Sequence, residues 1–110
     1  MNKIPLTIGS KFLEKFPDKI PVVVHYKDVM LLKSAKTMTS NLLIPKDNSI
    51  GYILVIVRRN FKIPHTQSLF LFVNSTLVDT KDTLDLVYSK YKNPSDGCLH
   101  VFVGKESTFN

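Results

Sequence analysis

One cysteine and three histidines are the side chains of this sequence that could act as nucleophiles, bases or metal ligands. Cys98 and His100 are two residues apart in a segment predicted as a strand, so both side chains would point to one face. Nucleophilic catalysis also needs a group that orients the base, and the sequence suggests none. A cysteine in a strand is more often a small buried apolar side chain. We therefore expect a protein that is not an enzyme.

Metal and cofactor sites are not expected either. His25, His65 and His100 are scattered along the sequence, and with a single cysteine they match no zinc-binding spacing. The four glycines are isolated, so no glycine-rich loop is available to hold a phosphate group. The sequence therefore predicts neither a metal nor a cofactor.

Length and composition are those of one small globular domain, with 110 residues, 44% hydrophobic and 22% charged. No apolar run is long enough to cross a bilayer, and residues 1–5 lack the features of a signal peptide, so we expect a cytoplasmic protein. Lysine and arginine number 15 against 9 acidic residues, a net charge of +6 that favours acidic partners. Because the basic residues are spread along the chain, nucleic acid is not the expected partner.

The first half of the chain predicts one short helix and two strands. Ser10 precedes an apolar set in a segment that must end by Pro17, which indicates a short helix. Residues 20–26 are rich in β-branched side chains and predict a strand. Residues 41–44 form a second apolar run, and the two strands are expected to pair as a hairpin.

The second half predicts two further strands and a helix after one ambiguous block. Residues 50–57 favour a strand by their β-branched content, yet several of their isoleucines and valines fit one face of a helix. Residues 68–73 predict a strand, residues 74–76 a turn, and Thr80 the N-cap of a helix. Residues 98–103 predict a last strand that is covered on both faces.

Three segments taken in order carry a resemblance: residues 16–23 (FPDKIPVV), residues 43–51 (LIPKDNSIG) leading to Arg58 and Arg59, and residues 69–77 (LFLFVNSTL). Together they resemble the autophagy-related ubiquitin-like modifiers, the family of autophagy-related protein 8, GABARAP and microtubule-associated protein light chain three. The resemblance covers about residues 11–110. It implies an α+β fold, a ubiquitin-like β-grasp domain over residues 20–110 preceded by an extension with one short helix over residues 1–19. It also implies that the ambiguous block is a helix.

The resemblance implies that the protein acts as a non-enzymatic tag, as members of the family do. A terminal glycine is joined to phosphatidylethanolamine on autophagosomal membranes, and the attached protein recruits receptors that carry an aromatic-x-x-aliphatic segment. The implied partners are these receptors and adaptors, a processing protease, activating and conjugating enzymes, and membrane lipid through the C-terminus. The chain itself is expected to be a monomer.

The resemblance also implies which residues bind the receptor segment. The segment is expected to add a strand at the edge formed by residues 41–44. Four apolar residues would line an aromatic pocket: Pro21, Val23, Leu43 and Cys98. Five more would line an aliphatic pocket: Leu42, Ile44, Pro45, Ile53 and Ile56. Lys19 and Arg58 would meet acidic residues that flank the segment. Without the resemblance, we would assign all of these apolar pocket residues to the hydrophobic core.

Several positions depart from the family pattern. Cys98 stands where a phenylalanine is usual, and Leu42 where an aromatic residue is usual. Asn110 occupies the position of the conjugated glycine, after Phe109, which would present the tail to the processing enzymes. Three alternatives therefore stay open. The first is a β-grasp peptide-binding module that is never conjugated, and the second is a relative of autophagy-related protein 12 that is joined to a protein. The third alternative is a basic RNA-binding module.

Overall fold

The computed structural model of the chain describes residues 8–27 and 37–105. Its elements, in chain order, are helix α1 (Ile8–Lys15), strands β1 (Lys19–Lys27) and β2 (Thr37–Pro45), helix α2 (Tyr52–Phe61), strands β3 (Phe70–Val73) and β4 (Thr76–Leu77), helix α3 (Leu84–Tyr91) and strand β5 (Leu99–Gly104). The strands form one sheet in the order β2-β1-β5-β3-β4. The predicted division into residues 1–19 and 20–110 stays a prediction.

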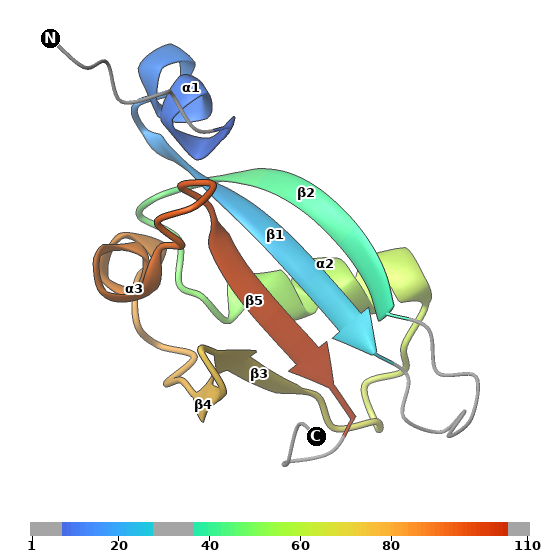
Figure 1. Cartoon of the computed structure of the whole chain (residues 1–110). Coiled ribbons are helices and arrows are strands. Elements are labelled where there is room, and N and C mark those ends of the chain that lie inside the picture. Colours follow the sequence, from blue (N-terminus) through green and yellow to red (C-terminus); the bar gives the residue numbers. More distant parts are fainter. Residues whose placement is uncertain (1–7, 28–36, 106–110) are drawn as a thin grey trace, which may run out of the picture.

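The sheet is mixed. β1 pairs with β2 as the predicted antiparallel hairpin and with β5 in parallel, while β5 pairs with β3 antiparallel. Figure 1 shows α2 running behind the sheet, α3 at one side of it, and α1 beyond the start of β1. This is the α+β arrangement that the resemblance implies, with a helix across one face of the sheet and a short helix before it.

The core lies between the sheet and α2, because alternate residues of the central strands point to that side. The buried residues of this layer include Val22, Val24 and Tyr26 from β1, Leu99, Val101 and Val103 from β5, and Ile53 and Val57 from α2. Between them, β5 residues His100 and Phe102 are only partly buried. The prediction that the last strand is covered on both faces is therefore wrong for β5, which has one open face.

The ambiguous block forms α2, as the resemblance implies and against the β-branched content of the segment. Ile53 and Val57, four residues apart, bury their side chains against the sheet, and this packing outweighs propensity. Arg58 and Arg59 lie in the last turn, where positive charge is favoured, and Lys62 ends the helix in the left-handed conformation with φ 54°.

The N-cap of α3 is Thr83 rather than the predicted Thr80. The Thr83 side chain accepts a hydrogen bond from the Leu86 amide at 3.3 Å. Thr80 instead uses its carbonyl to accept a hydrogen bond from the Gly51 amide at 3.0 Å, which anchors the start of α2. Both residues are threonines, so residue type alone could not show which one caps α3. The hydrogen bond between the Thr80 carbonyl and the Gly51 amide distinguishes them.

Two smaller expectations are also wrong. Helix α1 begins at Ile8, before the predicted cap at Ser10. Thr76, predicted as part of a turn, belongs to the two-residue strand β4 that pairs with β3. The turn itself is made by Asn74 and Ser75, both with positive φ, as a two-residue hairpin turn of type I′ requires.

Candidate functional site

Among the described residues, strand β2 is an edge of the sheet, since it lies first in the strand order and pairs there only with β1. An edge strand presents backbone N–H and C=O groups that a further strand can pair with. The predicted edge, residues 41–44, lies within β2. The structure therefore places these residues where the backbone of another chain could reach them.

The side chains along this edge alternate between the two faces of the sheet. Leu42 and Ile44 pair with Val22 and Ile20 of β1, and both pack on the core side. Asn41 and Leu43 pair with Val23 and Pro21, on the opposite face. The edge thus offers different surroundings to alternate residues of a strand laid along it.

A cavity of about 340 Å³ opens beside the edge, and eight residues line it: Phe12, Pro21, Val22, Val23, Asn41, Leu42, Asp96 and Cys98. Three of the four residues predicted for the aromatic pocket meet here, namely Pro21, Val23 and Cys98. Leu43 is not among the lining residues, while Leu42, predicted for the other pocket, is. Sequence reasoning missed Phe12, Val22 and Asp96 as lining residues. The apolar face of α1 was the signal for Phe12, and no local signal pointed to Asp96.

The five residues predicted for the aliphatic pocket divide into two groups. Ile44 and Ile53 are 2% and 0% exposed and belong to the core. Leu42 and Ile56 are partly buried and pack against that core, and Pro45 is exposed. Of the five, Leu42, Pro45 and Ile56 therefore keep accessible surface, whereas Ile44 and Ile53 are buried.

The two basic residues predicted to meet acidic flanks differ in their surroundings. Lys19 is exposed, with its Nζ 5.7 Å from the centroid of the Phe16 ring. Arg58 donates two hydrogen bonds from Nη1, to the carbonyls of Pro64 and Gln67, each at 2.8 Å. Arg58 thus holds the loop that follows α2, a structural role that the sequence did not indicate.

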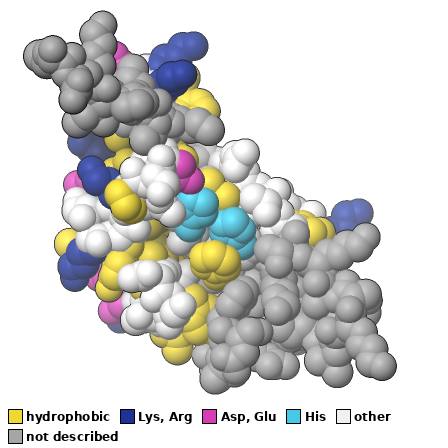
Figure 2. All heavy atoms as spheres, viewed as in Figure 1, with side chains coloured by type: hydrophobic (Ala, Val, Ile, Leu, Met, Phe, Trp, Pro, Cys, Tyr) yellow, Lys and Arg dark blue, Asp and Glu magenta, His cyan; other side chains and the backbone are white. Residues whose placement is uncertain are grey.

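A chain of hydrogen bonds crosses the open face of the sheet. Asp96 Oδ1 accepts from the Cys98 amide at 2.9 Å, and Asp96 Oδ2 accepts from His100 Nε2 at 2.6 Å. His100 Nδ1 is 2.9 Å from His25 Nε2, and the His25 ring stacks on Phe102 with the centroids 4.4 Å apart. Figure 2 shows the histidine pair as two adjacent cyan side chains on this face. The histidines are scattered in sequence but two of them are neighbours in space.

The surroundings of these groups shift their pKa values. Burial opposes ionisation of Asp96, but the hydrogen bonds from the Cys98 amide and from His100 outweigh it and lower the pKa of the carboxyl. Burial and then the charge of His100 lower the pKa of His25. Burial and the Asp96 carboxylate raise the pKa of the Cys98 thiol, which is 5% exposed. Cys98 is therefore a protonated, buried side chain and a poor nucleophile, as the sequence suggested.

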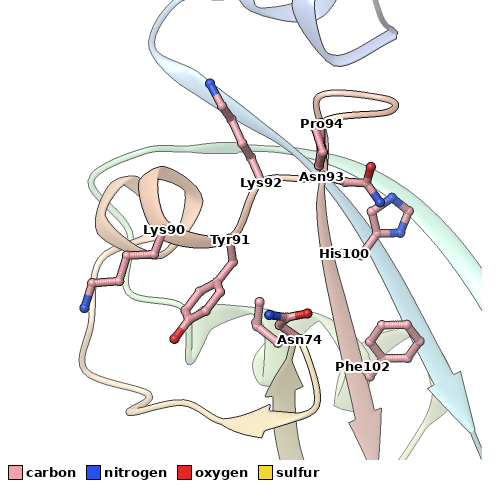
Figure 3. Close-up of a pocket in the computed structure, with 9 residues that line it drawn as sticks. Asn74, Lys90, Tyr91, Lys92, Asn93, Pro94, His100 and Phe102 are labelled. Atoms are coloured by element: carbon pink, nitrogen blue, oxygen red, sulfur yellow. The ribbon is translucent and has the colours of Figure 1, made fainter.

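A second cavity, of about 410 Å³, lies between β5 and the end of α3. In Figure 3, His100 and Phe102 lie on one side of it, Tyr91 and Asn74 on the other, and the side chains of Lys90 and Lys92 point away from it. His100 lines this cavity while its Nε2 contacts Asp96, which lines the first one. One hydrogen bond therefore connects the walls of both cavities.

Phe109 and Asn110, predicted as the conjugation tail, lie outside the described residues. Within residues 8–27 and 37–105, three or more histidine, cysteine or acidic side chains nowhere gather in a way that would hold a metal ion. In the same part of the chain, no helix has the length and apolar character needed to span a membrane.

Comparison with known proteins gives consistent results. The family described as "Autophagy protein Atg8 ubiquitin like" matches residues 7–110. Autophagy-related protein 8a of Arabidopsis thaliana is 32% identical over 104 residues, covering 92% of this chain and 80% of the relative. Autophagy-related protein 8 of Pichia angusta is 30% identical over 104 residues, covering 92% of this chain and 78% of the relative. A crystal structure of Trypanosoma brucei ATG8 has a similar fold, with a TM-score of 0.75 at 24% identity over 93% of this chain and 85% of that one. The last similarity confirms the predicted ubiquitin-like fold.

Proposed function

The chain belongs to the Atg8 family of ubiquitin-like autophagy proteins, which are non-enzymatic modifiers, and from this premise we propose that it recruits partners carrying an aromatic-x-x-aliphatic segment to its β2 edge. The proposal names residues 41–44 as the pairing strand and the cavity beside them as the site of the aromatic side chain. Receptor and adaptor proteins of autophagy would be the partners.

The observation that carries the proposal is that the two faces of the β2 edge differ. In an extended segment, residues i and i+3 point to opposite faces of the sheet. The aromatic residue of such a segment would enter the cavity near Pro21 and Val23, while the aliphatic residue three positions on would meet Leu42 and Ile56 on the side of α2. The alternation of the segment would thus direct its two anchor residues to the two different faces of the edge.

Charge supports the same partner. The net charge of +6 and the exposed Lys19 favour segments flanked by acidic residues. Ion pairs between Lys19 and acidic residues of the segment would lie at the exposed rim of the interface, where they speed association more than they raise affinity. Conjugation to phosphatidylethanolamine and attachment to autophagosomal membranes, with a processing protease and conjugating enzymes as partners, rest on family membership alone and complete the proposal.

Amide chemical shifts recorded during titration with a segment of this type test the proposed edge. We expect micromolar affinity, since a Kd of 1 μM corresponds to about 8 kcal/mol and so short a segment has few anchors. Shifts should centre on residues 41–44 and on Val23 and Cys98. Leu43→Ala should weaken binding, whereas Leu86→Ala, at an exposed position on α3, should leave it unchanged. Shifts confined to another face would contradict the assignment.

A further inference from the structure

The histidine pair on the open face of the sheet has one hydrogen atom between its two facing ring nitrogens. His100 Nε2 lies 2.6 Å from Asp96 Oδ2, and because an ionised carboxylate only accepts, Nε2 carries a hydrogen. The neutral imidazole then has a lone pair at Nδ1, so His25 Nε2, 2.9 Å away, is the donor. The three side chains thus form one directed chain of hydrogen bonds, from His25 through His100 to the carboxylate.

A first added proton leaves this chain of hydrogen bonds intact. If the proton binds His25, it goes to Nδ1, since Nε2 already carries a hydrogen, and Nε2 still donates to His100. If the proton instead binds His100 at Nδ1, His25 takes the tautomer with a lone pair at Nε2 and accepts the hydrogen bond. In both cases one hydrogen atom lies between the rings, and the hydrogen bond becomes charge-assisted and therefore stronger.

A second proton breaks the chain of hydrogen bonds. Both imidazoles then carry hydrogen on both nitrogens, so two N–H groups face each other at 2.9 Å and neither can accept. Two positively charged rings at this distance also repel each other. His100 keeps its carboxylate partner, whereas the remaining contact of His25 in this group is its stack on Phe102, with the ring centroids 4.4 Å apart and the planes at 12°. His25 is therefore the ring that moves.

Charged and titratable side chains near the pair decide how strongly each proton is opposed. Among the described residues they include Asp96, Cys98, Tyr88, Lys90 and Lys92, and the β2 residue opposite His25 is the uncharged Thr39. Burial raises the pKa of the Cys98 thiol and of the Tyr88 phenol, so both are neutral in acid, and the two lysines point away from the cavity that His100 lines (Figure 3). The Asp96 carboxylate, whose pKa is lowered, therefore balances the first positive charge. Burial and then the charge of His100 lower the pKa of His25, which opposes the second.

We propose that Asp96, His100 and His25 form a two-step proton switch, in which the first protonation keeps β1 and β5 linked on the open face and the second releases the His25 ring from Phe102. The switch does not depend on peptide binding at the β2 edge. It tells acidic from neutral surroundings, because the linked form persists until both rings are charged. The surface that changes is the wall of the second cavity, of about 410 Å³, to which His100 and Phe102 both belong.

An NMR titration of the full chain tests the switch, from about pH 8 to about pH 4.5, a range that spans histidine ionisation. The imidazole signals of His25 and His100 should change in two separate steps, which belong to the pair rather than to either ring. Nuclear Overhauser contacts between the His25 and Phe102 rings should persist through the upper step and be lost in the lower one. They should return when the pH is raised, while the amide spectrum stays that of a folded protein.

Three variants assign the two steps to these side chains. His25→Gln can still donate a hydrogen bond to His100 Nδ1 but takes up no proton, so the lower step should disappear and His100 should titrate in one step. Asp96→Asn removes the balancing charge and should move the upper step to lower pH. His65→Gln is the matched control, because it removes an exposed histidine outside the pair and should leave both steps unchanged. Amide spectra confirm that each variant is folded.

Each contrary outcome removes one part of the inference. Loss of the contact between the His25 and Phe102 rings in the upper step overturns the order of events. A single step common to both histidines, or two steps that survive in His25→Gln, overturns the shared hydrogen atom. A ring contact that persists when both imidazoles are charged overturns the release of His25.

Discussion

Ile53 and Ile56 allow the aliphatic side of the proposed site to be tested in detail. The sequence assigns both to one pocket, but the structure distinguishes them: Ile53 is 0% exposed in the core and Ile56 is only partly buried. We expect Ile53→Ala to reduce the free energy of unfolding without changing how the folded protein binds. Ile56→Ala should weaken peptide binding and have a smaller effect on stability.

The magnitudes follow from burial. Replacing isoleucine with alanine removes three carbon atoms, which at about 0.8 kcal/mol each gives about 2.4 kcal/mol for Ile53. The cavity left between α2 and the sheet adds to this, so a total loss of about 3–4 kcal/mol is expected. For a domain of this size that lowers Tm by about 13–17 °C. At Ile56, loss of a partly exposed contact should weaken peptide binding about tenfold, or about 1.4 kcal/mol.

Urea unfolding followed by circular dichroism measures the first effect, and peptide titration measured well below the lowered Tm gives the second. Ile53→Val, which removes one methyl group and should cost about 1 kcal/mol, is the milder variant if Ile53→Ala does not fold. Weaker peptide binding by a folded Ile53 variant, together with unchanged binding by Ile56→Ala, would refute the division of these residues into support and contact surface.

Two further predictions concern the histidine pair and the tail. Because the folded-state pKa of His25 is lowered below 6.5, the unfolded state binds more protons as the pH falls, so stability is fully present above pH 6.5 and is lost progressively below it. Its imidazole signals should titrate below 6.5 by NMR, and titration at or above that value would contradict the burial argument. At position 110, asparagine has a branched side chain where the family resemblance implies glycine, so Asn110→Gly should form lipid adduct in a reconstituted conjugation reaction more readily than the unchanged chain. Equal adduct formation by both chains would show that Asn110 is no obstacle.

Elements with a strong local pattern could be predicted from the sequence, and elements decided by distant contacts could not. The strands β1 and β3 were predicted from their β-branched and aromatic content. Residues 50–57 had conflicting local signals, and the helix there depends on burial of Ile53 and Val57 under the sheet. The cap of α3 was placed at the wrong threonine because Thr80 is engaged by Gly51, a residue from a different element.

The same reasoning applies to the site. Pro21, Val23 and Cys98 were assigned to one pocket by resemblance, and the structure brings them together. The hydrogen-bonded group of Asp96, His100 and His25 had no sequence signature, because the two histidines are 75 residues apart. They meet only because β1 and β5 pair in parallel, a contact between the two ends of the described chain that spacing along the sequence cannot indicate.

The position of β5 in the sheet has a consequence for biosynthesis. β5 is the last strand to be synthesised among those described, yet it lies between β1 and β3 in the middle of the sheet. While the chain is still emerging from the ribosome, β1 and β3 therefore lack the strand that joins them, and their apolar side chains have no shared core. The two halves can complete folding only after residues 99–104 are released, so the nascent protein depends on slow, long-range pairing and on protection from aggregation until then.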